Sequence, residues 1–251
     1  GQAVVWYTGQ FYALFFLEKT LKVDGALTNI LVAVALLLAT PFFVVFGWLS
    51  DKVGRKPVIL IGCLLAALTY FPLFKALTAA ANPALAAAAA SAPVVVAADP
   101  ADCSFQFDPV GKTAFTTSCD IAKSALANAG VSYRNVEAPA GSLATIRIGA
   151  TELASFRGES LDKPAFTAAK SAWTAELAAA LSGAGYPAKA DPAQVNKPLV
   201  VALLFLLVLY VTMVYGPIAA ALVEMFPARI RYTSMSLPYH VGNGWFGGFL
   251  P

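Results

Sequence analysis

Long apolar runs alternate with short polar segments at both ends of the chain. Four of these runs are almost free of charge and cover residues 1–17, 27–49, 57–78 and 198–226. About 20 apolar residues in a helix cross a bilayer, so each run is about long enough to span one. A fifth run, 235–251, is shorter and rich in glycine. The pattern predicts an all-α polytopic membrane protein with about five spans.

Two of the runs are interrupted near their middle. The second run carries Thr40-Pro41, and the fourth carries Gly216-Pro217. Proline removes one backbone hydrogen bond and bends a helix, which a membrane bundle tolerates when neighbours satisfy the freed carbonyl. We therefore expect the second span to be kinked at Pro41.

The middle of the chain has ordinary soluble patterning and carries most of the Asp, Glu, Lys and Arg. Its polar and apolar positions predict helices over 119–129 and 164–181 and strands over 131–136 and 144–148. The alanine run 84–90 is typical of a linker or of a poorly specified helix. We expect a small α/β insert between the membrane helices.

Charge gives the predicted orientation. The chain is 59% hydrophobic and 12% charged, whereas soluble domains are about 25% charged. The net charge of +3 resides in two short loops, 47–57 and 227–231, and not on one basic face. Short loops rich in Lys and Arg stay on the cytoplasmic side. The expected partner is therefore a lipid bilayer and not a nucleic acid.

Two spans separate the basic loops, so both loops fall on the cytoplasmic face and the insert between those spans is extracytoplasmic. The predicted domains are membrane helices over 1–78, the insert over 79–197 and membrane helices over 198–251. We expect a multi-pass protein of a bacterial-type inner (plasma) membrane.

Two stretches resemble a known transporter family. The pattern Gly47-x-Leu49-x-Asp51-Lys52-x-Gly54-Arg55-Lys56 is similar to the signature loop of the major facilitator superfamily. The stretch from Tyr215-Gly216-Pro217 through Glu224-Met225-Phe226-Pro227 and Arg229 to Tyr239-His240-Val241-Gly242-Asn243-Gly244 resembles the metabolite:proton symporter branch. That branch includes permeases for 2-oxoglutarate, shikimate, and proline or betaine.

The resemblance implies twelve helices in two six-helix halves. This chain would then cover helices seven to eleven, and its partner would be the missing N-terminal half of the same protein. The implied function is secondary active transport, with proton-coupled symport of a small organic acid or zwitterionic metabolite by alternating access. The fragment alone would be inactive. The insert departs from the family, which has a short loop at that place.

In the family, the loop Asp and Arg lock the cytoplasmic side when the transporter faces outward. Arg55 can form a bidentate pair with a carboxylate at the membrane edge, and Glu224 is the natural partner because both groups lie at the same predicted depth. The alternative is a set of solvated loop charges. The predicted gate comprises Gly47, Asp51, Gly54, Arg55, Lys56, Glu224, Arg229 and Arg231.

Proton coupling requires a titrating group within the bundle. His240 is the only histidine in the chain, and its unperturbed pKa lies in the working range. A packing or interface role, or acidic carriers in the missing half, are the alternatives. Coupling would use the proton gradient, and no bound cofactor is expected.

Polar groups at mid-membrane depth are candidates for contact with the solute, because an amide in lipid is costly unless it meets water or a partner. Hydrogen bonding between helices is the alternative. The candidates are Tyr7, Gln10, Tyr12, Tyr239 and Asn243.

The insert contains Cys103 and Cys119, and a disulfide between them would close a loop of about 15 residues in an oxidising compartment, stabilising the fold by about 3 kcal/mol. The insert contains no histidine, so no metal site is predicted. The sequence has no catalytic triad or phosphate loop, and we expect no enzymatic function. A second hypothesis is a membrane-anchored extracytoplasmic binding or sensing module carried by residues 100–190.

Overall fold

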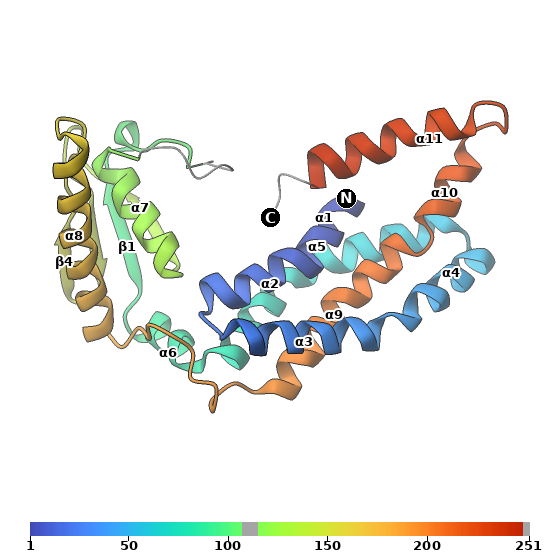
Figure 1. Ribbon diagram of the computed structural model, residues 1–251, viewed down its shortest axis with the longest axis horizontal. Coiled ribbons are helices and arrows are strands. Elements are labelled where there is room, and N and C mark those ends of the chain that lie inside the picture. The colour runs from blue at the N-terminus through green and yellow to red at the C-terminus, as the bar shows by residue number, and fades with distance from the viewer. Residues whose placement is uncertain (107–114, 248–251) are drawn as a thin grey trace. The chain divides into compact units, whose positions relative to one another are not determined.

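The computed structural model describes residues 1–106 and 115–247, apart from the side chains of Pro238, Asn243 and Phe246. The chain forms two compact units (Figure 1). The first comprises Gly1–Glu18, Val23–Ala81 and Pro192–Pro251, and the second comprises Lys19–Lys22 and Asn82–Asp191. The first is a helical bundle and the second contains a small sheet.

The first apolar run is helical from Gln2 to Thr20. Two α-helical pieces, α1 (Gln2–Tyr7) and α2 (Ala13–Phe15), are each followed by a π-helical segment, Thr8–Tyr12 and Phe16–Thr20. The helix lies close to the fourth apolar run, because a Cβ at Gly9 would come within 2.7 Å of Val211 Cγ2. The sequence pattern predicts the helix but not its π-helical segments.

The second run forms two helices, α3 (Gly25–Ala39) and α4 (Pro41–Val53), with the break at Thr40. Asp24 caps the start of α3 by accepting from the amide of Leu27 at 3.1 Å. The Thr40 hydroxyl donates to the carbonyl of Leu36 at 2.8 Å. The break lies where Pro41 predicts it, because proline has no N–H to donate to the preceding turn.

The third and fourth runs form the antiparallel centre of the bundle. They are α5 (Arg55–Ala81) and α9 (Lys197–Tyr215), and α10 (Ile218–Met225) follows α9 after Gly216-Pro217. The end of α5 lies beside the start of α9, since the amide of Asn196 donates to the carbonyl of Ala80 at 2.9 Å. Further along, a Cβ at Gly62 of α5 would lie 2.8 Å from Val214 Cγ2 of α9.

Within the described residues, three helical stretches are long and apolar enough to cross a membrane: Gly25–Val53, Arg55–Ala81 and Lys197–Met225. Many of their large apolar side chains face outward, and Phe71 is 88% exposed and Leu37 75% exposed. An exposed apolar surface of this extent marks contact with lipid or another protein. The fold is therefore mostly helical, with three candidate spans and one small sheet.

The last run begins as α11 (Arg231–His240) and continues as a π-helical segment, Val241–Gly247. It is not among the three candidate spans of the described chain, and neither is the first run. Residues 248–251 of the predicted fifth span lie outside the described residues.

The sheet of the second unit has the strand order β2-β1-β3-β4. β1 pairs in parallel with β2 and antiparallel with β3, and β3 pairs antiparallel with β4. The strands are β1 (Val94–Ala98), β2 (Tyr133–Glu137), β3 (Thr145–Ile148) and β4 (Thr151–Ala154). The sequence pattern predicts β2 and β3 but neither β1, the central Val-rich strand, nor β4.

The helices of this unit are α6 (Pro83–Ser91), α7 (Ser118–Ala129) and α8 (Lys163–Gly183), and a 3₁₀ turn covers Pro100–Asp102. α7 connects β1 to β2 and ends at Gly130, whose φ of +71° suits a glycine cap. α7 and α8 lie side by side (Figure 1), and both line one groove. The fully buried core includes Val96 of β1, Ile121 of α7 and Leu177 of α8.

Candidate functional site

Gly54 shapes the charged segment between α4 and α5. Its amide donates to the carbonyl of Ser50 at 3.0 Å and closes the last turn of α4. Its φ is +96°, a region that glycine adopts readily and other residues avoid. The chain changes direction there, and α5 begins at once with Arg55.

Arg55 joins two carboxylates from different helices. Its Nη1 contacts Oδ1 of Asp51 on the last turn of α4 and donates to Oγ of Ser50 at 2.8 Å. Its Nε and Nη2 each lie 3.2 Å from Oε1 of Glu224 in α10. The planar guanidinium suits this position because it presents several N–H donors in a fixed fork. The structure thus brings together Asp51, Arg55 and Glu224 of the predicted gate.

The two carboxylates are open to the surroundings. The side chains of Asp51 and Glu224 are 60% and 57% exposed, whereas that of Arg55 is 21% exposed. Exposed ion pairs contribute little to folding stability, because water and salt screen them. This contact can therefore break without unfolding the bundle.

The remaining charged residues of the predicted gate lie around this cluster. Lys56 and the Arg55–Glu224 pair line a mostly apolar groove of about 640 Å³. Nε of Arg231 donates to the carbonyl of Phe226 at 3.2 Å, beyond the end of α10. Within the described part of the chain, Arg229 forms no ion pair with Asp51 or Glu224.

A glycine outside the predicted gate allows close contact between α4 and the end of α9. A Cβ at Gly216 would lie 3.2 Å from the carbonyl oxygen of Phe43 and 3.6 Å from the amide nitrogen of Gly47. A Cβ at Gly47 itself would meet no described atom within 4 Å. Gly216 therefore permits the approach of the backbones. The Gly-Pro dipeptide at 216–217 indicates an interruption of the helix but not this contact.

Aromatic side chains from three helices meet at Tyr215, which the sequence analysis does not select. The hydroxyl oxygens of Tyr215 and Tyr239 lie 2.7 Å apart, and the rings of Tyr215 and Trp6 have centroids 4.2 Å apart. Tyr239, a predicted solute contact, therefore packs against the end of α9. Tyr7, another predicted contact, packs its ring 5.5 Å from that of Phe11.

Two further predicted solute contacts, Tyr12 and Gln10, belong to the first apolar run. Tyr12 packs against Phe16 and Phe74, with ring centroids 6.0 and 5.4 Å away. Gln10 is half-buried in the first π-helical segment. The side chain of Asn243 lies outside the described residues, and its backbone belongs to the last π-helical segment.

His240 lies at a small cavity between α10 and α11. Its ring packs edge-on against Tyr239, with centroids 5.7 Å apart. Both residues line a cavity of about 300 Å³ together with Ala219, Leu222, Met235 and Ser236. The predicted proton-coupling residue thus faces a space that a small molecule or water can enter.

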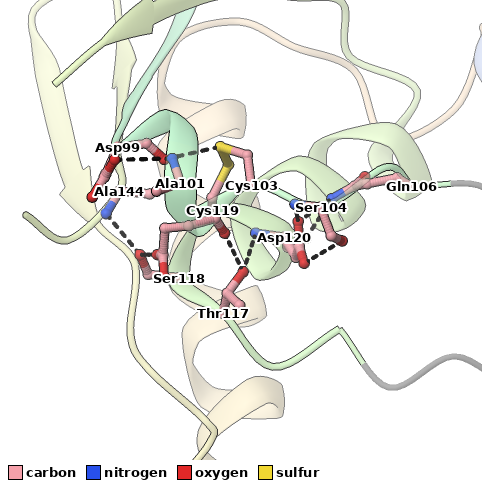
Figure 2. Close-up of a disulfide and its surroundings, with 11 residues drawn as sticks. Asp99, Ala101, Cys103, Ser104, Gln106, Thr117, Ser118, Cys119, Asp120 and Ala144 are labelled. Atoms are coloured by element: carbon pink, nitrogen blue, oxygen red, sulfur yellow. Dashed lines mark hydrogen bonds between the residues drawn. A yellow bond between two sulfur atoms is a disulfide. The ribbon is translucent and has the colours of Figure 1, made fainter. Parts of the chain in front are cut away.

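The second unit contains a disulfide between Cys103 and Cys119, with Cα atoms 5.1 Å apart (Figure 2). Beside it, the buried carboxylate of Asp120 accepts from the amide and the hydroxyl of Ser104, at 2.9 and 2.6 Å. Gln106 also donates to Asp120. The described residues contain no group of three or more His, Cys, Asp or Glu that could hold a metal ion.

Part of the chain is similar to curated transporter sequences. It is 37% identical over 51 residues to a protein named "Putative proline/betaine transporter" from Staphylococcus aureus strain COL, and equally to proteins of that name from other strains of the species. The match covers 20% of this chain and 11% of each relative. No protein-family profile matches the chain, and no solved structure matches it.

Proposed function

We propose that the chain is part of a secondary active transporter that carries a small organic acid or zwitterionic metabolite by alternating access, in symport with protons. The similarity to proteins named as proline/betaine transporters supports transport, and proline and betaine are small zwitterions. Transport requires no enzymatic step, and the proton gradient supplies the energy without a bound cofactor.

The observation that carries the proposal is the contact of Arg55 with both Asp51 and Glu224. It ties the α4–α5 connection to the end of α10, so it can hold one face of the bundle closed. Alternating access requires such a contact to form in one state and to break in the other. An exposed ion pair suits this role because the formed pair and the broken pair differ little in free energy.

In this proposal the first and last runs are also spans, which gives five membrane helices. These correspond to helices seven to eleven of a twelve-helix transporter, and the partner is the preceding six-helix half. The protein lies in the inner (plasma) membrane, with Arg55 on the cytoplasmic side. α5 has 27 residues and is therefore about 40 Å long. The insert attaches at the far end of α5, and we propose that residues 79–197 lie outside the cytoplasm.

We propose that the solute passes the polar groups on the first and last spans. Gln10, Tyr239 and Asn243 supply hydrogen-bonding groups in spans that are otherwise mostly apolar. His240 takes up and releases the coupled proton at the cavity that it lines.

The test is a charge exchange in the full-length protein. Arg55→Glu and Glu224→Arg are each expected to lower uptake of the transported solute about tenfold or more, because each places like charges together where attraction holds the gate. The double variant restores the opposite charges and is expected to recover much of the uptake.

A matched double variant, Glu224→Arg with Arg229→Glu, keeps the same net charge but leaves Arg55 facing a cation. It is expected to stay inactive. Membrane levels are compared by immunoblot. Failure of the Arg55/Glu224 exchange to recover uptake, at normal membrane levels, would refute the pairing.

A further inference from the structure

We propose that the second unit contains a thiol–disulfide exchange site, in which a small zwitterionic aminothiol attacks the Cys103–Cys119 disulfide. The unit's topology is the first observation. From β1 the chain passes through α7 to β2 on one side, and later to β3 on the other side. β1 and β2 run parallel, so their carboxyl ends lie at the same edge of the sheet, and α/β sheets bind ligands outside the carboxyl ends of such strands.

The disulfide follows the carboxyl end of β1. Cys103 comes directly after the 3₁₀ turn Pro100–Asp102, which follows β1, and Cys119 is the second residue of α7 (Figure 2). The two cysteines differ in exposure. Cys119 is fully buried, whereas Cys103 is partly exposed. Cys103 is therefore the more accessible of the two cysteines for an attacking thiol.

Cys103 also lines a cavity of about 330 Å³. This volume lies at the lower end of the range for small-molecule sites. The cavity walls include the ends of the two parallel strands, Ala98 of β1 and Glu137 of β2. The disulfide and the cavity therefore both lie by the carboxyl ends of the two parallel strands.

The charges of this cavity identify the ligand class. Lys123 of α7 and Glu137 of β2 both line it, and within the described residues neither forms an ion pair. An ammonium and a carboxylate on one small cavity match a ligand that carries both charges. A thiol with a carboxylate for Lys123 and an ammonium for Glu137 fits both and lies beside Cys103.

The exchange conserves atoms and electrons. The thiolate of the aminothiol forms a bond to Sγ of Cys103, the bond between Cys103 and Cys119 breaks, and its electron pair leaves on Sγ of Cys119. The first turn of α7 stabilises that thiolate, because a helix N-terminus favours negative charge. A second aminothiol then attacks the mixed disulfide. This second attack joins the two aminothiol molecules through a disulfide and leaves Cys103 as a thiolate. The protein disulfide is thereby reduced, and the two aminothiols are oxidised.

The experiment follows disulfide opening in the folded, detergent-solubilised full chain. A Cys63→Ala background removes the remaining thiol, and maleimide–polyethylene glycol labelling then counts opened cysteines. The probes are cysteine, which carries both charges, cysteamine, which lacks the carboxylate, and 3-mercaptopropionate, which lacks the ammonium. Each rate is divided by the rate of the same thiol with 2-hydroxyethyl disulfide, because thiolate nucleophilicity rises with thiol pKa. On this normalised scale, cysteine is expected to open the disulfide about 2- to 5-fold faster than either probe, the range expected for one partly exposed charge pair.

Substitutions at half-buried Lys123 and exposed Glu137 test the charges without altering the disulfide. Lys123→Gln is expected to remove the advantage of cysteine over cysteamine, and Glu137→Gln its advantage over 3-mercaptopropionate. The matched controls Lys163→Gln and Glu176→Gln, both on α8, are expected to change nothing. Mass spectrometry of the trapped intermediate is expected to find the adduct on Cys103.

Two results would overturn the proposal. A disulfide that stays closed to all three thiols until denaturant is added is a structural bridge only. Equal normalised rates for all three probes, or an adduct on Cys119, would remove the assigned site and its ligand class.

Discussion

At the residue scale, the ionisation of Asp99 makes the stability of the second unit depend on pH. Its carboxylate accepts from the amide of Gly141 at 2.7 Å and from that of Ala101 at 2.9 Å. These hydrogen bonds stabilise the charged form and lower the pKa of Asp99 below its usual value, and Arg157 acts in the same direction. The side chain thereby fastens the turn after β2 to the end of β1.

The lowered pKa of Asp99 determines how the stability of the unit changes with pH. The stabilisation is complete above the pKa of an unfolded aspartate, about 3.9, and is lost as the pH falls through the lower folded pKa. Asp99→Asn is expected to destabilise the unit at pH 7 and to approach the parent protein in stability near pH 2. Urea unfolding followed by Trp173 fluorescence, with Trp6, Trp48 and Trp245 replaced by Phe, measures this. A difference that is the same at both pH values would contradict it.

The site residues that the sequence predicts are those whose side-chain type stands out from the apolar runs around them. Asp51, Arg55 and Glu224 are found because each is a charge at the end of an apolar run, and such charges are few. Tyr215 and Gly216 are not selected, because their roles depend on which helix lies opposite. That information is set by packing and is absent from the local pattern.

At the element scale, the crossing of α4 with the end of α9 depends on Gly216. Gly216→Ala is expected to destabilise the bundle by about 1–3 kcal/mol, because the added methyl would lie 2.8 Å from the carbonyl oxygen of Thr212 in α9 and 3.2 Å from that of Phe43 in α4, which forces a shift. Gly47→Ala is the matched control on the facing helix, where a Cβ has open space. It is expected to be neutral or stabilising by up to about 1 kcal/mol, because alanine favours a helix.

Thermal unfolding in detergent, with both variants at equal expression, gives the comparison. Equal loss of stability in the two variants would show that the contact geometry at Gly216 does not govern this crossing.

Some helices and strands have a sequence pattern that predicts them, and others do not. Long apolar helices and the break at Pro41 follow from hydropathy and from proline chemistry. β1 is missed because a short apolar run has no periodicity that separates a buried strand from a piece of helix. The π-helical segments of the first and last runs have no sequence signature that predicts them.

At the scale of the whole molecule, the longer segment of the second unit, residues 82–191, leaves the bundle and returns to it at one point. The carbonyl of Ala80 and the amide of Asn196 are hydrogen-bonded at 2.9 Å, so the chain leaves and re-enters the bundle at adjacent positions. Replacing residues 82–191 by a short Gly/Ser linker in the full-length protein is expected to keep uptake within about twofold, because a flexible loop can join adjacent ends at small entropic cost.

The alternative hypothesis predicts the opposite. If residues 100–190 carry the function as a binding or sensing module, the deletion abolishes activity while the membrane level of the protein stays normal. Uptake and immunoblot of the same membranes separate the two accounts.

The central claim is that the protein moves a solute across a membrane with protons. The direct measurement is uptake of labelled proline, betaine and 2-oxoglutarate by liposomes that contain the full-length protein, with and without an inward proton gradient. Our account predicts that at least one solute accumulates above its outside concentration only with the gradient, and that a protonophore abolishes this. No accumulation of any solute across an extended panel of organic acids and zwitterions, or accumulation that ignores the proton gradient, would contradict it.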